Sequence, residues 1–202
     1  MPPAKKTQSR KAKDKRSERD KIIDAALDLA AAKRWRDLSM SEIAEHAGVG
    51  IGATILAIPS RTHILKALID RIDQEVLTSL EADPLDGTTK DKLFDLLMRR
   101  FDALQGHRAA MASISSDLIR DPISAACLGG RFLKSMALTL QAAGASSEGC
   151  SGHIRAKALG LVQINAARAW LKDESEGLEH TMSTLDKGLQ RAEKLAGGEV
   201  LA

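Results

Sequence analysis

Several residue types are scarce in this 202-residue sequence. It contains no tyrosine, and its two tryptophans and three phenylalanines bring the aromatic content to only 2%. The two cysteines, Cys127 and Cys150, are too few for a disulfide scaffold, which favours an intracellular protein. No apolar run approaches the roughly 18 residues of a membrane-spanning helix. Because Asp24 and Asp28 interrupt the first apolar stretch, a secretory signal is disfavoured, and we expect a cytoplasmic protein without a membrane span.

Catalytic and metal-binding patterns are missing as well. The five histidines lie at least seventeen residues apart, with no cysteine or carboxylate at ligand spacing. The sequence has no glycine-rich phosphate loop and no nucleophile elbow. We therefore expect no enzyme, no metal site and no cofactor. The two cysteines are better explained as buried or incidental thiols than as a redox pair.

Charge is distributed unevenly along the chain, although its net value is only +3. Residues 1–21 hold nine basic and three acidic side chains, whereas residues 67–202 hold sixteen basic and nineteen acidic ones. We expect residues 1–16 to form a disordered basic arm. Such an arm suits contact with a polyanion, but a purely solubilising tail explains the charge equally well.

Apolar residues recur at helical spacing throughout, without sustained alternation typical of strands, so we predict an all-α fold of about nine helices. Five helix starts carry capping signals. These are Ser17, the Ser39–Glu42 capping box, Ser60, Thr88 or Thr89, and Asp121-Pro122. The last two helices are expected over residues 153–172 and 176–196, after a loop at 145–152.

Residues 39–58 have the spacing of a helix-turn-helix, in which Gly48 supplies the turn and small Ala44 allows close helix packing. Taken alone, this spacing also fits any helical hairpin with a glycine turn. The wider stretch over residues 22–70 resembles the N-terminal domain of the TetR family of bacterial transcriptional regulators. The matching residues are Ile23, Ala26, Leu27, Ser39, Ile43, Ala44, Ala47, Gly48, Val49, Gly52, Ser60, Arg61, Ile64 and Leu65.

This resemblance implies a TetR-like, ligand-responsive regulator in a bacterial cytoplasm, with repression favoured over activation. It implies a helix-turn-helix domain over residues 17–66 that binds double-stranded DNA, and a helical ligand-binding and dimerisation domain over residues 67–202. Four DNA-contacting positions carry over by the resemblance, namely Ser39, Ser41, Thr54 and Arg61. The basic arm adds candidate phosphate contacts at Lys11, Lys13, Lys15 and Arg16.

The expected recognition helix departs from the family pattern. From Gly50 to Ile58 the only polar side chain is Thr54, and the family's usual aromatic pair falls at Ile55 and Ile58. Bases are distinguished mainly by side-chain hydrogen bonds, which this helix hardly offers, although apolar residues can contact thymine methyl groups. Sequence-specific DNA reading is therefore the weak part of the prediction.

The departure leaves a second family open. A lipid-binding accessory family of ubiquinone biosynthesis shares the TetR fold without reading DNA. Residues 170–175, followed by Thr181, Leu185, Asp186 and Leu189, faintly resemble the last two helices of that family. Under this alternative the chain binds isoprenoid lipid and no operator.

A ligand pocket between the later helices is expected under either resemblance. The bulky, adaptable candidates for its wall are Phe94, Met98, Phe101, Met111, Phe132, Met136 and Trp170. Gln163, with Asn165 and Arg168, places polar groups in an otherwise apolar helix, where they suit a ligand head group. The alternative is that the bulky residues form core and the polar ones face solvent or a partner subunit. Few fixed polar groups indicate a hydrophobic small-molecule ligand.

The helix expected over residues 153–172 is apolar on more than one face, with Ile154, Leu161 and Ile164 among its apolar residues. A single chain would cover one face and leave another exposed. We therefore predict a homodimer in which this helix and the one over residues 176–196 pair with their mates in a four-helix bundle.

Overall fold

The computed structural model describes residues 17–195, so the candidate arm residues Lys11, Lys13, Lys15 and Arg16 lie outside the described residues. Over this range the chain forms nine α-helices, two short 3-10 helices and no strand, which confirms the all-α prediction. The elements are α1 (Glu18–Ala32), η1 (Trp35–Asp37), α2 (Met40–Ala47), α3 (Ile51–Ala57), α4 (Arg61–Ser79), α5 (Thr89–Leu104), η2 (Gln105–His107), α6 (Arg108–Arg120), α7 (Pro122–Ala142), α8 (Gly149–Trp170) and α9 (Glu179–Leu195).

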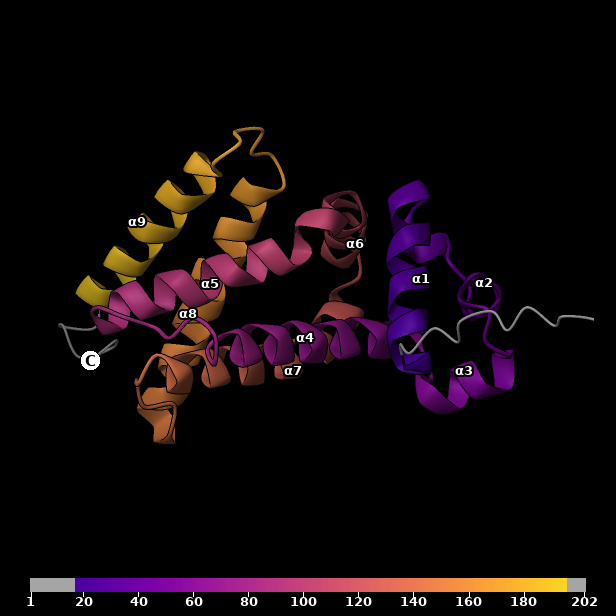
Figure 1. Ribbon diagram of the computed structural model, residues 1–202, viewed down its shortest axis with the longest axis horizontal. Helices are drawn as coiled ribbons and strands as arrows, with labels where there is room; N and C mark the ends of the chain where they lie inside the picture. The colour runs from indigo at the N-terminus through magenta and orange to yellow at the C-terminus, as the bar shows by residue number, and fades with distance from the viewer. Residues whose placement is uncertain (1–16, 196–202) are drawn as a thin grey trace, which may run out of the picture.

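The helices fall into a head and a body joined by α4 (Figure 1). Helices α1, α2 and α3 gather at one end of the molecule, α5 and α7 to α9 make up the other, and α4 extends from the first group into the second. The expected boundary between residues 66 and 67 therefore lies within α4. Because an α-helix is stiff, a shift of its body end is carried into the head.

Local capping explains where several helices begin. The Ser39 hydroxyl accepts from the Glu42 amide while the Glu42 carboxylate accepts from the Ser39 amide, so both halves of the capping box are formed. The expected caps at Ser17, Ser60, Thr88 and Asp121 are formed as well. These short-range contacts fix the helix starts independently of the tertiary fold.

Two helix starts differ from the sequence expectation. Helix α8 begins at Gly149, inside the expected loop at 145–152, because the chain reverses at Gly149 with a φ of 66°. Helix α9 begins at Glu179, because the Asp173 carboxylate accepts hydrogen bonds from Ser175 and Thr181 and holds the intervening chain in a turn. The starts of α8 and α9 thus depend on local backbone geometry and hydrogen bonds that cannot be predicted from helical periodicity.

Candidate DNA-binding surface and ligand cavity

The turn between α2 and α3 depends on Gly48, whose φ of 65° lies in the left-handed region. The amide of Val49 then donates to the Ala44 carbonyl oxygen across 3.0 Å and closes the end of α2. Ile43 and Ala44 are buried beneath the turn. Helix α3 is consequently held with one face on the head and the other toward solvent.

The solvent face of α3 is apolar. It consists of Ile51, Gly52, Ala53, Ile55, Leu56 and Ala57, and Leu56 is 89% exposed. Thr54 is fully buried and its Oγ1 has no hydrogen-bond partner among the described residues, so its expected role as a DNA contact is wrong for this placement. Helical phase explains the difference, since Thr54 points into the head together with Ile58.

The other three expected DNA-contacting side chains have different surroundings. Ser39 and Ser41 are exposed at the start of α2, although the Ser39 hydroxyl is engaged with Glu42. The Lys33 ammonium, with hydrogen bonds from Ser39, lowers the pKa of the Glu42 carboxyl to about 2. Arg61 is half-buried and donates from NH1 to the Trp35 carbonyl oxygen across 2.7 Å. Ser41 is therefore the freest of the three.

A cavity of about 330 Å³, partly open to solvent, lies between α4, α5, α6, α7 and α8. Its wall is built from Leu65, Leu68, Ile69, Ile72, Arg100, Phe101, Leu104, Met111, Ile114, Ser115, Leu118, Ala125, Leu128, Gly129, Phe132, Gln163, Ile164, Ala167, Trp170 and Leu171. A concave, largely apolar space of this size is typical of small-molecule sites.

Five of the expected ligand residues line this cavity, namely Phe101, Met111, Phe132, Gln163 and Trp170. Met136 is fully buried in the core, and neither it nor Met98 belongs to the cavity wall. Phe94 faces a separate, open hollow between α5 and α9. These three residues lie outside the wall because the cavity lies against the C-terminal end of α5 and the N-terminal half of α7. The α4 side of the wall was not among the expected ligand residues, although its apolar stripe is visible in the sequence.

Two polar side chains of the cavity wall, Arg100 and Trp170, are already paired. The Trp170 indole stacks on Phe101 with ring centroids 5.6 Å apart, and its Nε1 donates to Gln105 across 3.0 Å. Arg100 donates to the Asp73 carboxylate across 2.5 Å. Gln163 is only 7% exposed, and its Oε1 is buried without a hydrogen-bond partner among the described residues. Among the described residues of the wall, Gln163 is thus the one with a buried side-chain oxygen that lacks a partner.

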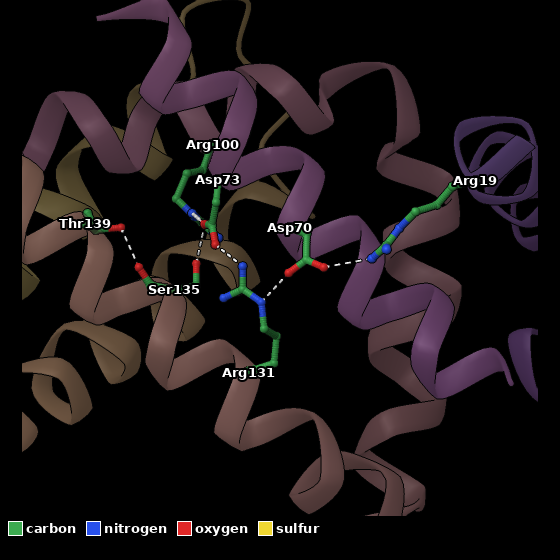
Figure 2. Close-up of polar contacts among 7 residues, drawn as sticks. All are labelled: Arg19, Asp70, Asp73, Arg100, Arg131, Ser135 and Thr139. Atoms are coloured by element: carbon green, nitrogen blue, oxygen red, sulfur yellow. Dashed lines mark hydrogen bonds and ion pairs between the residues drawn. The ribbon is translucent and has the colours of Figure 1, made fainter. Parts of the chain in front are cut away.

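Behind the cavity, Asp73 on α4 is buried and collects donors from two neighbouring helices (Figure 2). Arg100 approaches it from α5, and Arg131 and Ser135 approach it from α7. Asp73 lies on the buried face of α4, next to Ile72 and near Val76. A buried carboxylate is tolerated only when it is paired and hydrogen-bonded, and these three donors provide that.

The same contacts continue from Asp73 toward the head. Arg131 also pairs through Nε with Asp70 one turn earlier on α4, and Asp70 accepts from Arg19 of α1 across 2.9 Å. We call Arg19, Asp70, Asp73, Arg100, Arg131 and Ser135 the carboxylate network. It links a residue of the cavity wall, Arg100, to the first helix of the head. Sequence spacing gave no sign of these pairs, since their partners are 27 to 62 residues apart.

Helix α6 makes a second connection between cavity and head. Met111, Ile114, Ser115 and Leu118 face the cavity, whereas Ser113 and Asp117 face η1. The backbone amides of Trp35 and Arg36 donate to the Ser113 hydroxyl and the Asp117 carboxylate across 3.0 and 2.8 Å. We call these two contacts the α6 clasp.

The outer face of α8 carries apolar residues that the single chain leaves uncovered. Ile154 is 61% exposed and Leu161 is 70% exposed, and Ile164 lies along the same stripe at helical spacing. Met182 on α9 is also exposed. The stripe has the form of a helix-pairing surface.

The described residues hold few features of other site types. Among residues 17–195, no group of three or more histidine, cysteine or carboxylate side chains is arranged to hold a metal ion. None of the helices in this range combines the length and apolar character needed to cross a bilayer. Cys127 and Cys150 are both free and exposed, so of the two expected alternatives, buried or incidental thiols, the first is wrong.

Comparison with known proteins agrees with this architecture. Residues 22–68 match the family model of bacterial regulatory proteins, tetR family. Among solved structures, the chain is similar to a TetR transcriptional regulator from Nitrosomonas europaea ATCC 19718, with a TM-score of 0.70 and 23% identity, covering 89% of this chain and 99% of that one. It is also similar to a TetR transcriptional regulator from Rhodococcus sp. RHA1, with a TM-score of 0.57 and 21% identity over 89% and 96% of the two chains.

A further similar structure is the transcriptional regulator FadR from Bacillus subtilis, solved in complex with stearoyl-CoA. Its TM-score is 0.56 and its identity 19%, with 85% of this chain and 95% of that chain covered. At such identities these likenesses concern the fold. No curated protein matches the chain.

Proposed function

We propose that the chain is a DNA-binding transcriptional regulator of the TetR family, and that it is a ligand-responsive repressor that acts in the bacterial cytoplasm. In this proposal the head binds operator DNA, the body cavity binds a hydrophobic small molecule, and α8 and α9 pair two chains. The match over residues 22–68 favours this function over the lipid-binding accessory protein that the sequence also resembles.

The observation that carries the proposal is that two walls of the cavity also hold the head. Helix α4 lines the cavity and continues from the head, and α6 lines it while clasping η1. A ligand that changes the packing of either helix therefore changes the position of the head. In a dimer, this alters the spacing of two heads and hence their fit to two half-sites on DNA.

Contacts to thymine methyl groups are the mode of base reading that suits α3. Its exposed side chains are aliphatic and offer no donors or acceptors to base edges. Thymine is the only base that presents a methyl group in the major groove. Phosphate contacts from the basic arm would supply most of the affinity, and their contribution falls steeply with salt.

Selection of genomic DNA by the purified full-length protein at about 150 mM salt tests this function. We expect an enriched inverted repeat whose half-sites contain thymine at the positions facing α3. If no sequence is enriched and mass spectrometry finds quinone-like lipid in the purified protein, the lipid-binding alternative replaces the proposal.

Deletion of residues 1–16 separates the arm from the recognition helix. We expect the truncated protein to bind the selected operator more weakly while keeping its preference for operator over random DNA. If the preference is lost together with the affinity, α3 does not read bases.

A further inference from the structure

The amide of Gln163 is an incomplete polar group in the cavity wall. Its side chain lines the cavity and is more than nine-tenths buried, yet Oε1 has no hydrogen-bond partner among the described residues. A buried acceptor without a partner is costly, and native structures rarely leave one unsatisfied. In an apolar cavity, the missing partner is readily supplied by a ligand.

We propose that Gln163 receives the head group of the ligand, and that the ligand is an uncharged amphiphile with a hydroxyl or amide N–H donor. This inference rests on the proposed function, because it names the class of small molecule for the same cavity. The donor binds Gln163 Oε1, and the apolar part of the ligand lies against the aliphatic and aromatic wall.

The pairing of the charged group in the wall disfavours an anionic head group. Among the described residues that line the cavity, Arg100 alone carries a charge. Arg100 is 5% exposed and its guanidinium is paired with Asp73, which also binds Arg131 and Ser135 (Figure 2). A carboxylate or phosphate entering the cavity would lose its hydration without gaining an unpaired cation, which is strongly unfavourable.

The remaining polar groups do not compete with Gln163 for this role. Trp170 Nε1 is occupied by Gln105. Ser115 on α6 is only half-buried, so solvent can satisfy its hydroxyl, whereas Gln163 Oε1 is buried without a partner among the described residues. Gln163 belongs to the same helix as the exposed stripe with Leu161 and Ile164. A ligand held by Gln163 is therefore attached directly to the helix proposed to pair the two chains.

Three probes that share a ten-carbon chain test the inference with the full-length protein. They are 1-decanol, which can donate a hydrogen bond, 1-methoxydecane, which cannot, and decanoate at pH 8, which is an anion. Binding is followed by tryptophan fluorescence, because Trp170 lines the cavity. We expect 1-decanol to bind about 3- to 10-fold more tightly than 1-methoxydecane, as one net hydrogen bond allows. Decanoate should bind most weakly.

Gln163→Leu removes the acceptor at similar volume and should abolish the preference for 1-decanol over 1-methoxydecane. Gln141→Leu, at an exposed glutamine of α7 outside the cavity, is the matched control and should keep it. Since the leucine replaces an unpaired buried amide, the Gln163→Leu variant should melt no lower than the parent protein. Lost selectivity would then not reflect unfolding.

Three outcomes would overturn the inference: decanoate binding as tightly as 1-decanol, a preference that survives in Gln163→Leu, or no binding of any probe. The DNA selection described above reports on the proposed function separately. If the protein enriches an operator yet binds decanoate more tightly than 1-decanol, the proposed neutral head group is wrong while the proposed regulatory function still holds.

Discussion

At the residue scale, two glycines within helices differ in what surrounds them. An added Cβ at Gly130 in α7 would meet nothing within 4 Å, whereas one at Gly152 in α8 would lie 2.1 Å from the carbonyl carbon of Ser147. Glycine lowers helix stability by raising the backbone entropy of the unfolded chain, so its replacement helps only where space exists.

We predict that Gly130→Ala raises the free energy of unfolding by about 0.5–1 kcal/mol. Its melting temperature, followed by circular dichroism, should rise by roughly 1–4 °C for a chain of this size. Gly152→Ala should melt well below the parent protein because the Ser147 backbone must move. Equal effects of the two substitutions would contradict the packing described around them.

Asp173 gives the corner between α8 and α9 a dependence on pH. Hydrogen bonds from Ser175 and Thr181 to the ionised carboxylate hold the pKa of Asp173 well below its usual range. The native state therefore favours the charged form. The stability that Asp173 contributes is complete above the unfolded pKa of about 3.9 and is lost as the pH falls toward the lowered native value.

Asp173→Asn should consequently be less stable than the parent protein at pH 7. The difference should narrow below about pH 4, where the aspartate itself becomes protonated. Urea denaturation of both proteins between pH 3 and 7 measures it. A gap that stays constant over this range would mean that the charge of Asp173 plays no part in the corner.

At the element scale, the features that can be predicted from the sequence are those formed by residues close together in the chain. A helix cap such as Ser39 with Glu42 is formed by residues three positions apart, so it can be recognised from the sequence alone. The buried face of α3 cannot be predicted in this way. The helix has only seven residues and carries apolar residues on every face, so its pattern does not show which face is buried. The sequence alone therefore does not show that Thr54, expected as a DNA contact by the family resemblance, points into the head.

Ion pairs between residues far apart in the chain likewise cannot be predicted from the sequence. Asp73 meets Arg100 and Arg131 only because α5 and α7 pack against α4 at that height, and no spacing rule connects residues so far apart. Gln163 was recognised as a polar residue in an apolar helix, but its lack of a partner depends on the tertiary structure. The sequence thus identifies these polar residues but does not show which side chains they bind in the folded protein.

The carboxylate network predicts unequal effects for two of its arginines. Arg131 is largely buried and binds both Asp70 and Asp73, whereas Arg19 is exposed and binds Asp70 alone. Arg131→Met should lower the free energy of unfolding by about 1.5–3 kcal/mol, as expected for hydrogen bonds to charged groups. Arg19→Met should cost less than about 1 kcal/mol, since exposed pairs contribute little.

Urea denaturation distinguishes these two cases. Because Arg131 ties α7 to α4 beside the cavity, its loss is also expected to weaken the effect of a bound ligand on operator affinity. Arg19→Met, which is the matched control on the head side, should have the smaller effect on stability. If both variants are as stable as the parent protein, the network does not hold the body helices together.

At the scale of the whole molecule, the head and the body each carry an exposed leucine, and we expect the two to serve different contacts. Leu161 belongs to the apolar stripe of α8, and Leu56 belongs to the apolar face of α3. A dimer through α8 and α9 would cover the first and leave the second free for DNA. Two heads held by one dimer gain affinity because the second binds at high effective concentration.

Leu161→Glu should therefore give a particle of 21.7 kDa by light scattering, whereas the parent protein should show twice that mass. Its operator affinity should fall by at least 100-fold, since each head then binds alone. Leu56→Glu, the same change in the head, should remain a dimer and lose operator binding, because a carboxylate on α3 is repelled by the DNA phosphates and finds no donor at a thymine methyl group. A dimeric Leu161→Glu protein would place the subunit interface elsewhere, while full operator binding by Leu56→Glu would remove α3 from the DNA-binding surface.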